Sequence, residues 1–162
     1  MRILTAFVFC LVGLPAFAQE QPSQGDLTFH AGQFSALRDK PRRSFTAGME
    51  YRFPDQFHGL RPTIGALANA DGAIYGYGGI NWDLPVPSTP IIVTPGFVAG
   101  GYSQGDSKDL GHGIEFRSTL EVTYRFEDGQ RVGAAISHLS NASLDNDNPG
   151  TETIQAVYSL PF

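Results

Sequence analysis

Three residue types that cooperate in ester hydrolysis lie near the C-terminal end of the chain. His138 and Ser140 are two residues apart, and Glu152 follows them after a polar loop. On a β-strand, His138 and Ser140 point to the same face, and the returning strand of a hairpin can bring Glu152 beside them. The spacing therefore predicts a catalytic triad in which Ser140 is the nucleophile, His138 the base and Glu152 the carboxylate that orients the imidazole.

Such a triad also needs hydrogen-bond donors for the negative charge that develops on the substrate oxygen. Asn141 directly follows the predicted nucleophile, and Asn148 lies further along the same polar loop. Either side-chain amide, together with nearby backbone N–H groups, is a candidate for this oxyanion hole. The residues alone leave the choice between the two asparagines open.

The first eighteen residues predict an export signal rather than a part of the fold. Arg2 supplies a positive charge, residues 3–14 form an apolar run, and Ala16-Phe17-Ala18 has the pattern of a cleavage site. The apolar run is shorter than the roughly 20 residues that a membrane-spanning helix needs. We therefore expect residues 1–18 to be removed and residues 19–162 to form a single domain.

The net charge argues against nucleic acid as a partner, and the cysteine content argues against disulfides and cysteine-based metal sites. The formal net charge of the whole chain is −5, and phosphate binding requires a basic surface, so nucleic acid is not an expected partner. The single cysteine, Cys10, lies within the predicted export signal. The mature chain therefore has neither a disulfide nor a cysteine-based metal site.

The clearest strand signal covers Ile114 to Phe126, where one face is mainly apolar and the other is polar and charged over thirteen positions. Strands of soluble sandwiches usually run about five or six residues. Strands of transmembrane barrels need about 9 to 11 residues and present their apolar face to lipid. The length of this segment therefore favours a membrane barrel.

Similar patterns predict the remaining strands of that barrel, at residues 27–35, 44–53, 60–69, 73–83, 91–102, 130–140 and 153–162. Together with residues 114–126 they make eight strands, the smallest usual barrel, whose interior is filled by side chains. The terminal Phe162 resembles the C-terminal signature of outer-membrane barrels. The predicted fold class is therefore all-β, an eight-stranded antiparallel transmembrane β-barrel of the bacterial outer membrane.

The alternation along each strand divides charged residues between the inside and the outside of this barrel. On the seventh strand, His138 and Ser140 continue the outward row, and Glu152 is in register with outward residues of the last strand. With both termini in the periplasm, the predicted triad lies at the extracellular ends of these strands, on the outer wall. Inside, we expect a network of charges formed by Glu50, Arg52, Glu115, Arg117, Glu121 and Arg125.

The motif His138-x-Ser140-Asn141-Ala142, followed by Asn148-Pro149-Gly150-x-Glu152, resembles the signature of the lipid A 3-O-deacylase (PagL) family. The resemblance implies that His138, Ser140 and Glu152 form the triad of a serine esterase that requires no metal and no cofactor. It also implies that Asn141, or its competitor Asn148, contributes to the oxyanion hole. The implied substrate is lipid A of lipopolysaccharide, cleaved at its 3-position ester by an active site that faces the outer leaflet of the outer membrane.

A basic segment in the first outward loop is suited to lipid A phosphates or core sugars, although such clusters also occur on ordinary solvated loops. Its cations are Arg38, Lys40, Arg42 and Arg43. Two other functions stay open: an outer-membrane phospholipase, which Glu152 and the small barrel disfavour, and a structural or adhesive barrel. For the assembly we expect a monomer or a weak homodimer.

Overall fold

The computed structural model describes residues 24–37 and 43–162, so the export signal lies outside the described residues and stays a prediction. No helix in this part of the chain is long and apolar enough to cross a membrane. Buried and exposed residues alternate along each long strand, as their sequences predict. The strands are β1 (Asp26–Phe34), β2 (Ser44–Arg52), β3 (Leu60–Asn69), β4 (Ile74–Trp82), β5 (Leu84–Pro85), β6 (Ile91–Ser103), β7 (Ile114–Arg125), β8 (Arg131–Ser140) and β9 (Thr151–Pro161).

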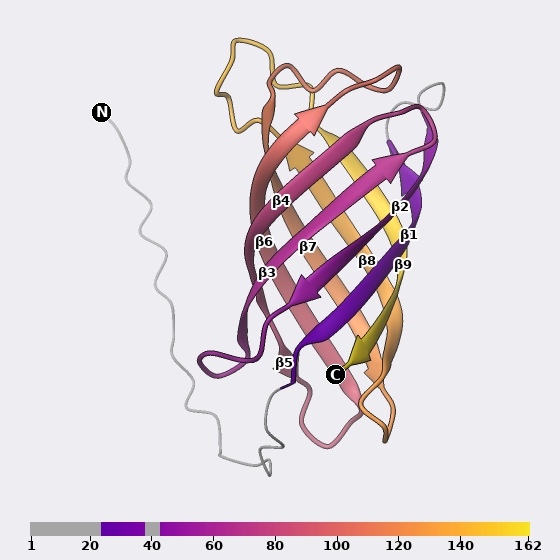
Figure 1. The fold of residues 1–162 in the computed structure, drawn as a ribbon, viewed down its shortest axis with the longest axis vertical. Coiled ribbons are helices and arrows are strands. Elements are labelled where there is room, and N and C mark those ends of the chain that lie inside the picture. Colours follow the sequence, from indigo (N-terminus) through magenta and orange to yellow (C-terminus); the bar gives the residue numbers. More distant parts are fainter. Residues whose placement is uncertain (1–23, 38–42) are drawn as a thin grey trace, which may run out of the picture.

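All neighbouring strands pair antiparallel, and the sheet closes on itself (Figure 1). The order is β4-β3-β2-β1-β9-β8-β7-β6-β5, and β4 also pairs with β6. The two-residue β5 continues β4 beyond Asp83, because Asn81 pairs with Gly96 and Leu84 pairs with Val93 in one register on β6. Since β4 and β5 together act as one strand, the molecule is a closed eight-stranded barrel, which confirms the predicted fold.

The two ends of the barrel carry different connections (Figure 1). The loop end, at the top of Figure 1, holds residues 35–37 and 43 and the connections 70–73, 104–113 and 141–150. The terminus end holds Gln24, Phe162 and the connections 53–59, 86–90 and 126–130. In the last of these, Gly129 adopts a left-handed φ of 83° and closes the tight turn that the Asp128-Gly129 pair predicts.

The outer surface of the barrel is a belt of apolar side chains. Large apolar residues point outward from all the long strands, among them Met49, Ile64, Phe97, Leu120 and Ile136, which are each at least two-fifths exposed. Soluble proteins rarely expose contiguous apolar surface on this scale, whereas a closed barrel in a bilayer requires it. The belt therefore indicates a barrel that is embedded in lipid.

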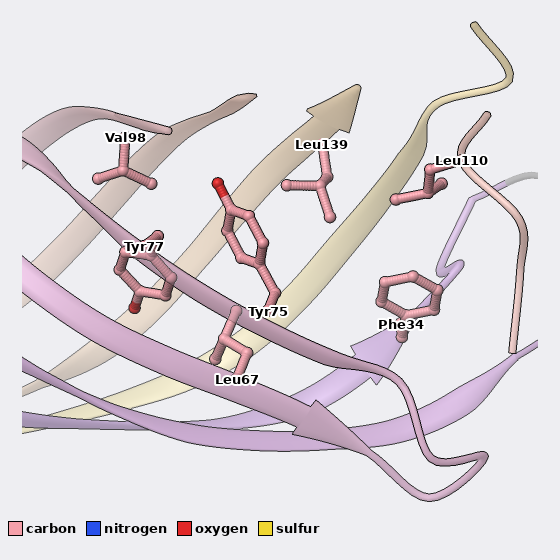
Figure 2. Packing of buried hydrophobic residues seen from close by; sticks show 7 residues of the cluster. All are labelled: Phe34, Leu67, Tyr75, Tyr77, Val98, Leu110 and Leu139. Carbon is pink, nitrogen blue, oxygen red and sulfur yellow. The ribbon is translucent and has the colours of Figure 1, made fainter. Parts of the chain in front are cut away.

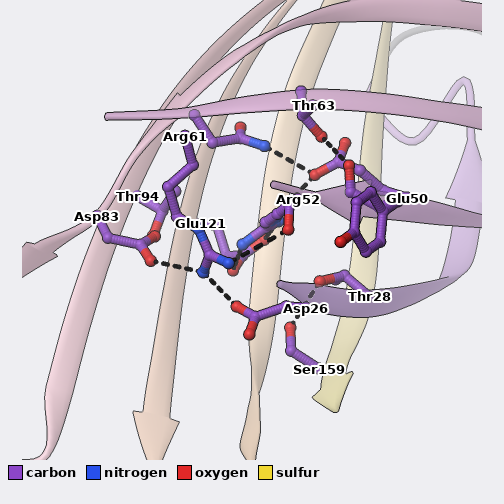
Figure 3. A network of polar contacts seen from close by, with 12 residues as sticks. Asp26, Thr28, Glu50, Arg52, Arg61, Thr63, Asp83, Thr94, Glu121 and Ser159 are labelled. Carbon is purple, nitrogen blue, oxygen red and sulfur yellow. Dashed lines mark hydrogen bonds and ion pairs between the residues drawn. The ribbon is translucent and has the colours of Figure 1, made fainter. Parts of the chain in front are cut away.

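The interior towards the terminus end is filled by paired charges (Figure 3). The Arg52 guanidinium donates to both carboxylate oxygens of Glu121, at 3.0 and 2.7 Å, and its Nε donates to Glu50 at 2.7 Å. A second cluster joins Arg61 and Arg131 to Asp26 and Asp83. These side chains come from six different strands or connections, so the network ties opposite walls of the barrel together.

Two members of the predicted interior network are placed differently. Glu50, Arg52, Arg117 and Glu121 are buried and joined by ion pairs inside the barrel, as predicted. Glu115 is also buried, but its carboxylate has no hydrogen-bond partner among the described residues. Arg125, in contrast, is exposed at the last position of β7. The prediction is wrong here because the strand has reached the rim of the barrel, where a long side chain can extend into water.

Towards the loop end the interior becomes apolar (Figure 2). The buried cluster consists of Phe34, Leu67, Tyr75, Tyr77, Val98, Leu110 and Leu139. Leu110 comes from the connection between β6 and β7, yet it is completely buried among the strand residues. Leu139 belongs to β8 and lies between His138 and Ser140 in sequence, so this cluster supports the strand that carries two of the predicted triad residues.

Candidate active site

His138 and Glu152 lie directly opposite each other on β8 and β9. The Nδ1 atom of His138 is 3.4 Å from the Oε1 atom of Glu152, within ion-pair distance and slightly longer than a typical hydrogen bond. The His138 side chain is 48% exposed and that of Glu152 is 11% exposed. The pair therefore has the arrangement that a carboxylate needs to orient an imidazole, with Nδ1 rather than Nε2 of His138 towards the carboxylate.

Both residues continue the outward rows of their strands, as the sequence predicts. Ile136 and Ile154 also pair directly, one step down the same two strands, and both are exposed in the apolar belt. His138 and Glu152 thus lie where the apolar belt of the wall ends at the loop end. The contact between them is on the outside of the barrel, separate from the interior charge network.

Ser140 is the last residue of β8 and is partly buried. It lies two residues after His138, so the two side chains share a face at a Cα separation of about 6.6 to 6.8 Å. No hydrogen bond joins the Ser140 hydroxyl to any of the residues that the structure describes. In unliganded enzymes the bond between nucleophile and base is often long and tightens only with substrate bound. The structure thus brings His138 and Glu152 into contact and leaves Ser140 beside them.

The two candidate oxyanion asparagines have different surroundings. Asn141 is completely buried, and its side-chain amide donates to the carbonyl oxygens of Leu110 at 3.0 Å and Asp147 at 2.8 Å. Asn148 is exposed, and its Oδ1 accepts the backbone N–H of Asn141 at 3.1 Å. Both N–H groups of the Asn141 amide are therefore used within the loops, whereas the amide nitrogen of Asn148 points away from the backbone that its oxygen binds.

The bonds of Asn141 also connect two loops that are distant in sequence. Leu110 belongs to the β6–β7 connection, and Asp147 belongs to the β8–β9 connection. Beyond Asn141, Ala142 and Ser143 adopt left-handed φ angles of 53° and 64°, a conformation that is uncommon for residues other than glycine. The Asn141 Oδ1 accepts the Ser143 backbone N–H at 2.9 Å and stabilises this bend. The sequence does not predict the link between the two loops, because it joins residues that are distant in the chain. It does not predict the bend either, because neither alanine nor serine signals a left-handed conformation.

Of the four cations in the basic segment, Arg43 alone is among the described residues. Arg38, Lys40 and Arg42 lie outside the described residues. Arg43 is exposed and donates from Nη2 to the carbonyl oxygen of Ala36 at 2.9 Å. The backbone N–H of Ala36 in turn donates to the carbonyl oxygen of Glu152 at 2.9 Å. The connection between β1 and β2 therefore begins next to the backbone of Glu152.

Within residues 24–37 and 43–162, no group of three or more His, Cys, Asp or Glu side chains could hold a metal ion. The described residues of the site are instead a nucleophile type, an imidazole, a carboxylate and an exposed amide. This set can perform acyl transfer with its own side chains: attack, proton transfer and stabilisation of an oxyanion.

Comparison with known proteins supplies a family for this barrel and its site. A family model described as lipid A 3-O-deacylase (PagL) matches residues 20–161. A relative from Bordetella bronchiseptica, named lipid A deacylase PagL, is 25% identical over 165 residues and covers 91% of this chain and 89% of its own. A protein of the same name from Pseudomonas aeruginosa is 34% identical over 62 residues, which are 38% of this chain and 35% of its own.

Solved structures show the same fold. The crystal structure of the outer membrane enzyme PagL matches with a TM-score of 0.61 at 19% identity, over 85% of this chain and 99% of its own. The crystal structure of Neisserial surface protein A matches with the same TM-score, 0.61, at 13% identity over 88% of this chain and 100% of its own. Since the two fit equally well, the fold alone does not select an activity, which has to be argued from the site.

Proposed function

Because the chain belongs to the lipid A 3-O-deacylase (PagL) family, we propose that it hydrolyses the ester at the 3-position of lipid A and releases the primary 3-hydroxy fatty acid. The observation that carries this proposal is the contact of 3.4 Å between His138 Nδ1 and Glu152 Oε1 on the outer wall, with Ser140 on the same face. The chain is an outer-membrane β-barrel, and its substrate is a lipid of that membrane.

The proposed reaction follows the chemistry of a serine esterase. Nε2 of His138 takes the proton of the Ser140 hydroxyl as Oγ attacks the ester carbonyl, and Glu152 stabilises the imidazolium. The tetrahedral intermediate collapses, the bond between the acyl carbon and the 3-oxygen of the sugar breaks, and His138 gives the proton to that oxygen, which leaves as the 3-hydroxyl group. Water then attacks the acyl-enzyme with His138 again as base, which releases the fatty acid and restores Ser140.

The amide of Asn148 is the favoured side-chain donor for the oxyanion. Its Oδ1 is held by the Asn141 backbone N–H, so its amide nitrogen keeps two N–H groups for the substrate oxygen. Asn141 supports the same site differently, by fixing the loop that carries Asn148. A donor that is positioned before the substrate arrives stabilises the developing charge without further reorganisation.

The position of the triad on the wall suits an acyl ester of a lipid. The exposed side chains of Ile136 and Ile154 lie directly below His138 and Glu152 in the apolar belt, where an acyl chain can pack. In barrels of this kind the longer connections face the cell exterior, which assigns the loop end to the outer leaflet. The ester of a lipid A molecule in that leaflet then lies level with Ser140.

The basic segment is the proposed contact for the phosphates or core sugars of lipid A. It comprises Arg38, Lys40, Arg42 and Arg43. The hydrogen bond from Ala36 to the Glu152 backbone supports this proposal, because it brings a residue just before the segment in sequence next to the proposed triad. Cations at this position complement the anionic head group of the substrate while its acyl chain packs on the wall.

Mass spectrometry of lipid A tests this function in the refolded mature barrel, with Ser140→Ala and Ser118→Ala as paired variants. Ser118 is an exposed outward serine on β7 that lies directly opposite His138, so it is a matched control for a nearby hydroxyl. We expect the wild type and Ser118→Ala to remove one 3-hydroxyacyl group, and Ser140→Ala to remove none. Loss of a phospholipid acyl chain instead would favour the phospholipase, and no product with any folded barrel would favour the structural barrel.

A further inference from the structure

We propose that Gly150 is a positioning residue for the imidazole of His138, an inference that rests on the proposed function. Gly150 is the last residue of the connection between β8 and β9, two residues before Glu152. It is buried although most of that connection is exposed. Its place is therefore beside the triad rather than at the tip of the loop.

The backbone of Gly150 lies against the edge of the His138 ring. A Cβ atom added to Gly150 would be 3.0 Å from Cε1 and 3.3 Å from Nε2 of that ring, and 3.4 Å from the Leu139 carbonyl oxygen. Nδ1, which is bonded to Cε1 in the ring, faces the Glu152 carboxylate at 3.4 Å. Glu152 and the Gly150 main chain therefore lie next to neighbouring parts of the imidazole, Nδ1 and the Cε1–Nε2 edge.

These two neighbours matter because the His138 side chain is otherwise largely open to solvent. Its side chain is nearly half exposed, and the Glu152 contact is its single ion pair among the described residues. A contact at one ring atom leaves rotation about the side-chain torsions open, whereas contacts at Nδ1 and along the Cε1–Nε2 edge restrict it. Nε2, the proposed proton acceptor, lies on the edge beside Gly150, so Gly150 determines where that acceptor lies.

A side chain at position 150 would disturb this arrangement in two separable ways. The φ of Gly150 is +45°, in the left-handed region where an alanine is strained. Independently, a Cβ in close contact with Cε1 requires the ring or the loop to move by a few tenths of an ångström. Because proton transfer depends steeply on the geometry of the reacting atoms, a displacement of Nε2 lowers kcat more than it changes substrate binding.

Gly72 provides a matched control at the same end of the barrel. It also has a left-handed φ, +84°, but an added Cβ would meet no atom closer than 3.9 Å. Gly72→Ala therefore reproduces the backbone strain without the contact. Conversely, Gly150→Asn keeps the contact but lessens the strain, because asparagine tolerates the left-handed conformation better than other residues with a Cβ.

The test compares wild type, Gly150→Ala, Gly150→Asn and Gly72→Ala as full mature barrels refolded in detergent. Initial rates of lipid A deacylation give kcat and KM, and spectra of protein labelled with ¹³C at histidine Cε1 report the His138 ring in the same samples. We expect both Gly150 variants to lose about tenfold in kcat, to keep KM within about twofold, and to shift the His138 Cε1–H resonance. Gly72→Ala should match the wild type in all three quantities.

Two results would overturn the proposal about Gly150. One is a folded, active Gly150→Ala barrel whose kcat equals that of Gly72→Ala. The other is a His138 Cε1–H resonance that stays in place in both Gly150 variants. A folded wild-type barrel that deacylates no lipid A would instead overturn the proposed function itself, and with it the catalytic consequence assigned to Gly150.

Discussion

Charged side chains occupy two regions of this barrel, and their surroundings differ. Inside, Arg52 contacts Glu50 and Glu121 with three hydrogen bonds of 3.0 Å or less, and all three side chains are at most 2% exposed. On the outer wall, His138 meets one carboxylate at 3.4 Å and is nearly half exposed. The Ser140 hydroxyl beside it has no hydrogen-bond partner among the described residues.

The difference distinguishes charges that stabilise the barrel from charged groups that can act on a substrate. A buried network whose donors and acceptors are mutually satisfied is rigid and has no atom left for a substrate. The wall site has the opposite character, since the His138 side chain is nearly half exposed and the hydroxyl of the proposed nucleophile Ser140 has no hydrogen-bond partner among the described residues. The number of charges is therefore a poor guide to function in this barrel, because the interior holds many charges whose role is structural.

Removal of the imidazole from the wall should have the largest effect on activity. His138→Ala should lower kcat by about 10³-fold or more, because the nucleophile loses its base. The urea midpoint of unfolding in detergent should stay unchanged, since His138 is half exposed and contributes little burial. A large drop in the unfolding midpoint with proportionate loss of activity would contradict this division of roles.

Removing a carboxylate from the interior should have the opposite pattern. Glu121→Ala leaves Arg52 without its bidentate partner in a fully buried position, which costs about 3 to 5 kcal/mol of stability. Activity per folded molecule should remain close to the wild-type value. Urea unfolding and rate measurements on the same sample test this, and a catalytic defect in fully folded Glu121→Ala would show that the two regions are coupled.

A smaller effect is expected at the oxyanion donor. Asn148→Ala should lower kcat by roughly 10²-fold, the usual consequence of losing one preorganised donor to the oxyanion. Asn146→Ala is the matched control, because Asn146 is an exposed asparagine in the same loop. Steady-state rates compare the two variants, and equal activity of Asn148→Ala and Asn146→Ala would exclude Asn148 as the donor.

Much of the barrel can be predicted from the sequence because side chains alternate between the two faces of a strand. The pattern of apolar and polar residues therefore indicates on which side of the wall each residue lies. The alternation around Ile114 predicts β7 to within one residue at its C-terminal end, and the same parity places His138 on the outer wall. Parity fails at the rim, where Arg125 is exposed although its row points inward. It also cannot indicate the interruption at Asp83 that divides β4 from β5.

The loops around the site are less predictable, because their contacts join residues that are distant in the chain. The bonds of Asn141 to Leu110 and Asp147 depend on how the β6–β7 and β8–β9 connections meet above the barrel. The sequence motif gives Asn141 as a candidate and Asn148 as its competitor, and the choice of Asn148 depends on these contacts. The approach of Gly150 to His138 likewise depends on a φ angle that the adjoining residues do not specify.

The most direct test of the central claim asks whether Ser140 is activated. A lipophilic fluorophosphonate, which loses fluoride when an activated serine oxygen attacks its phosphorus, is added to the refolded wild type, His138→Ala and Ser118→Ala. Peptide mapping by mass spectrometry then locates the adduct. We expect Ser140 to be labelled in the wild type and in Ser118→Ala, and to be unlabelled in His138→Ala. A folded wild-type barrel that is labelled at Ser118, or not at all, would contradict the assignment of Ser140, His138 and Glu152 as a catalytic triad.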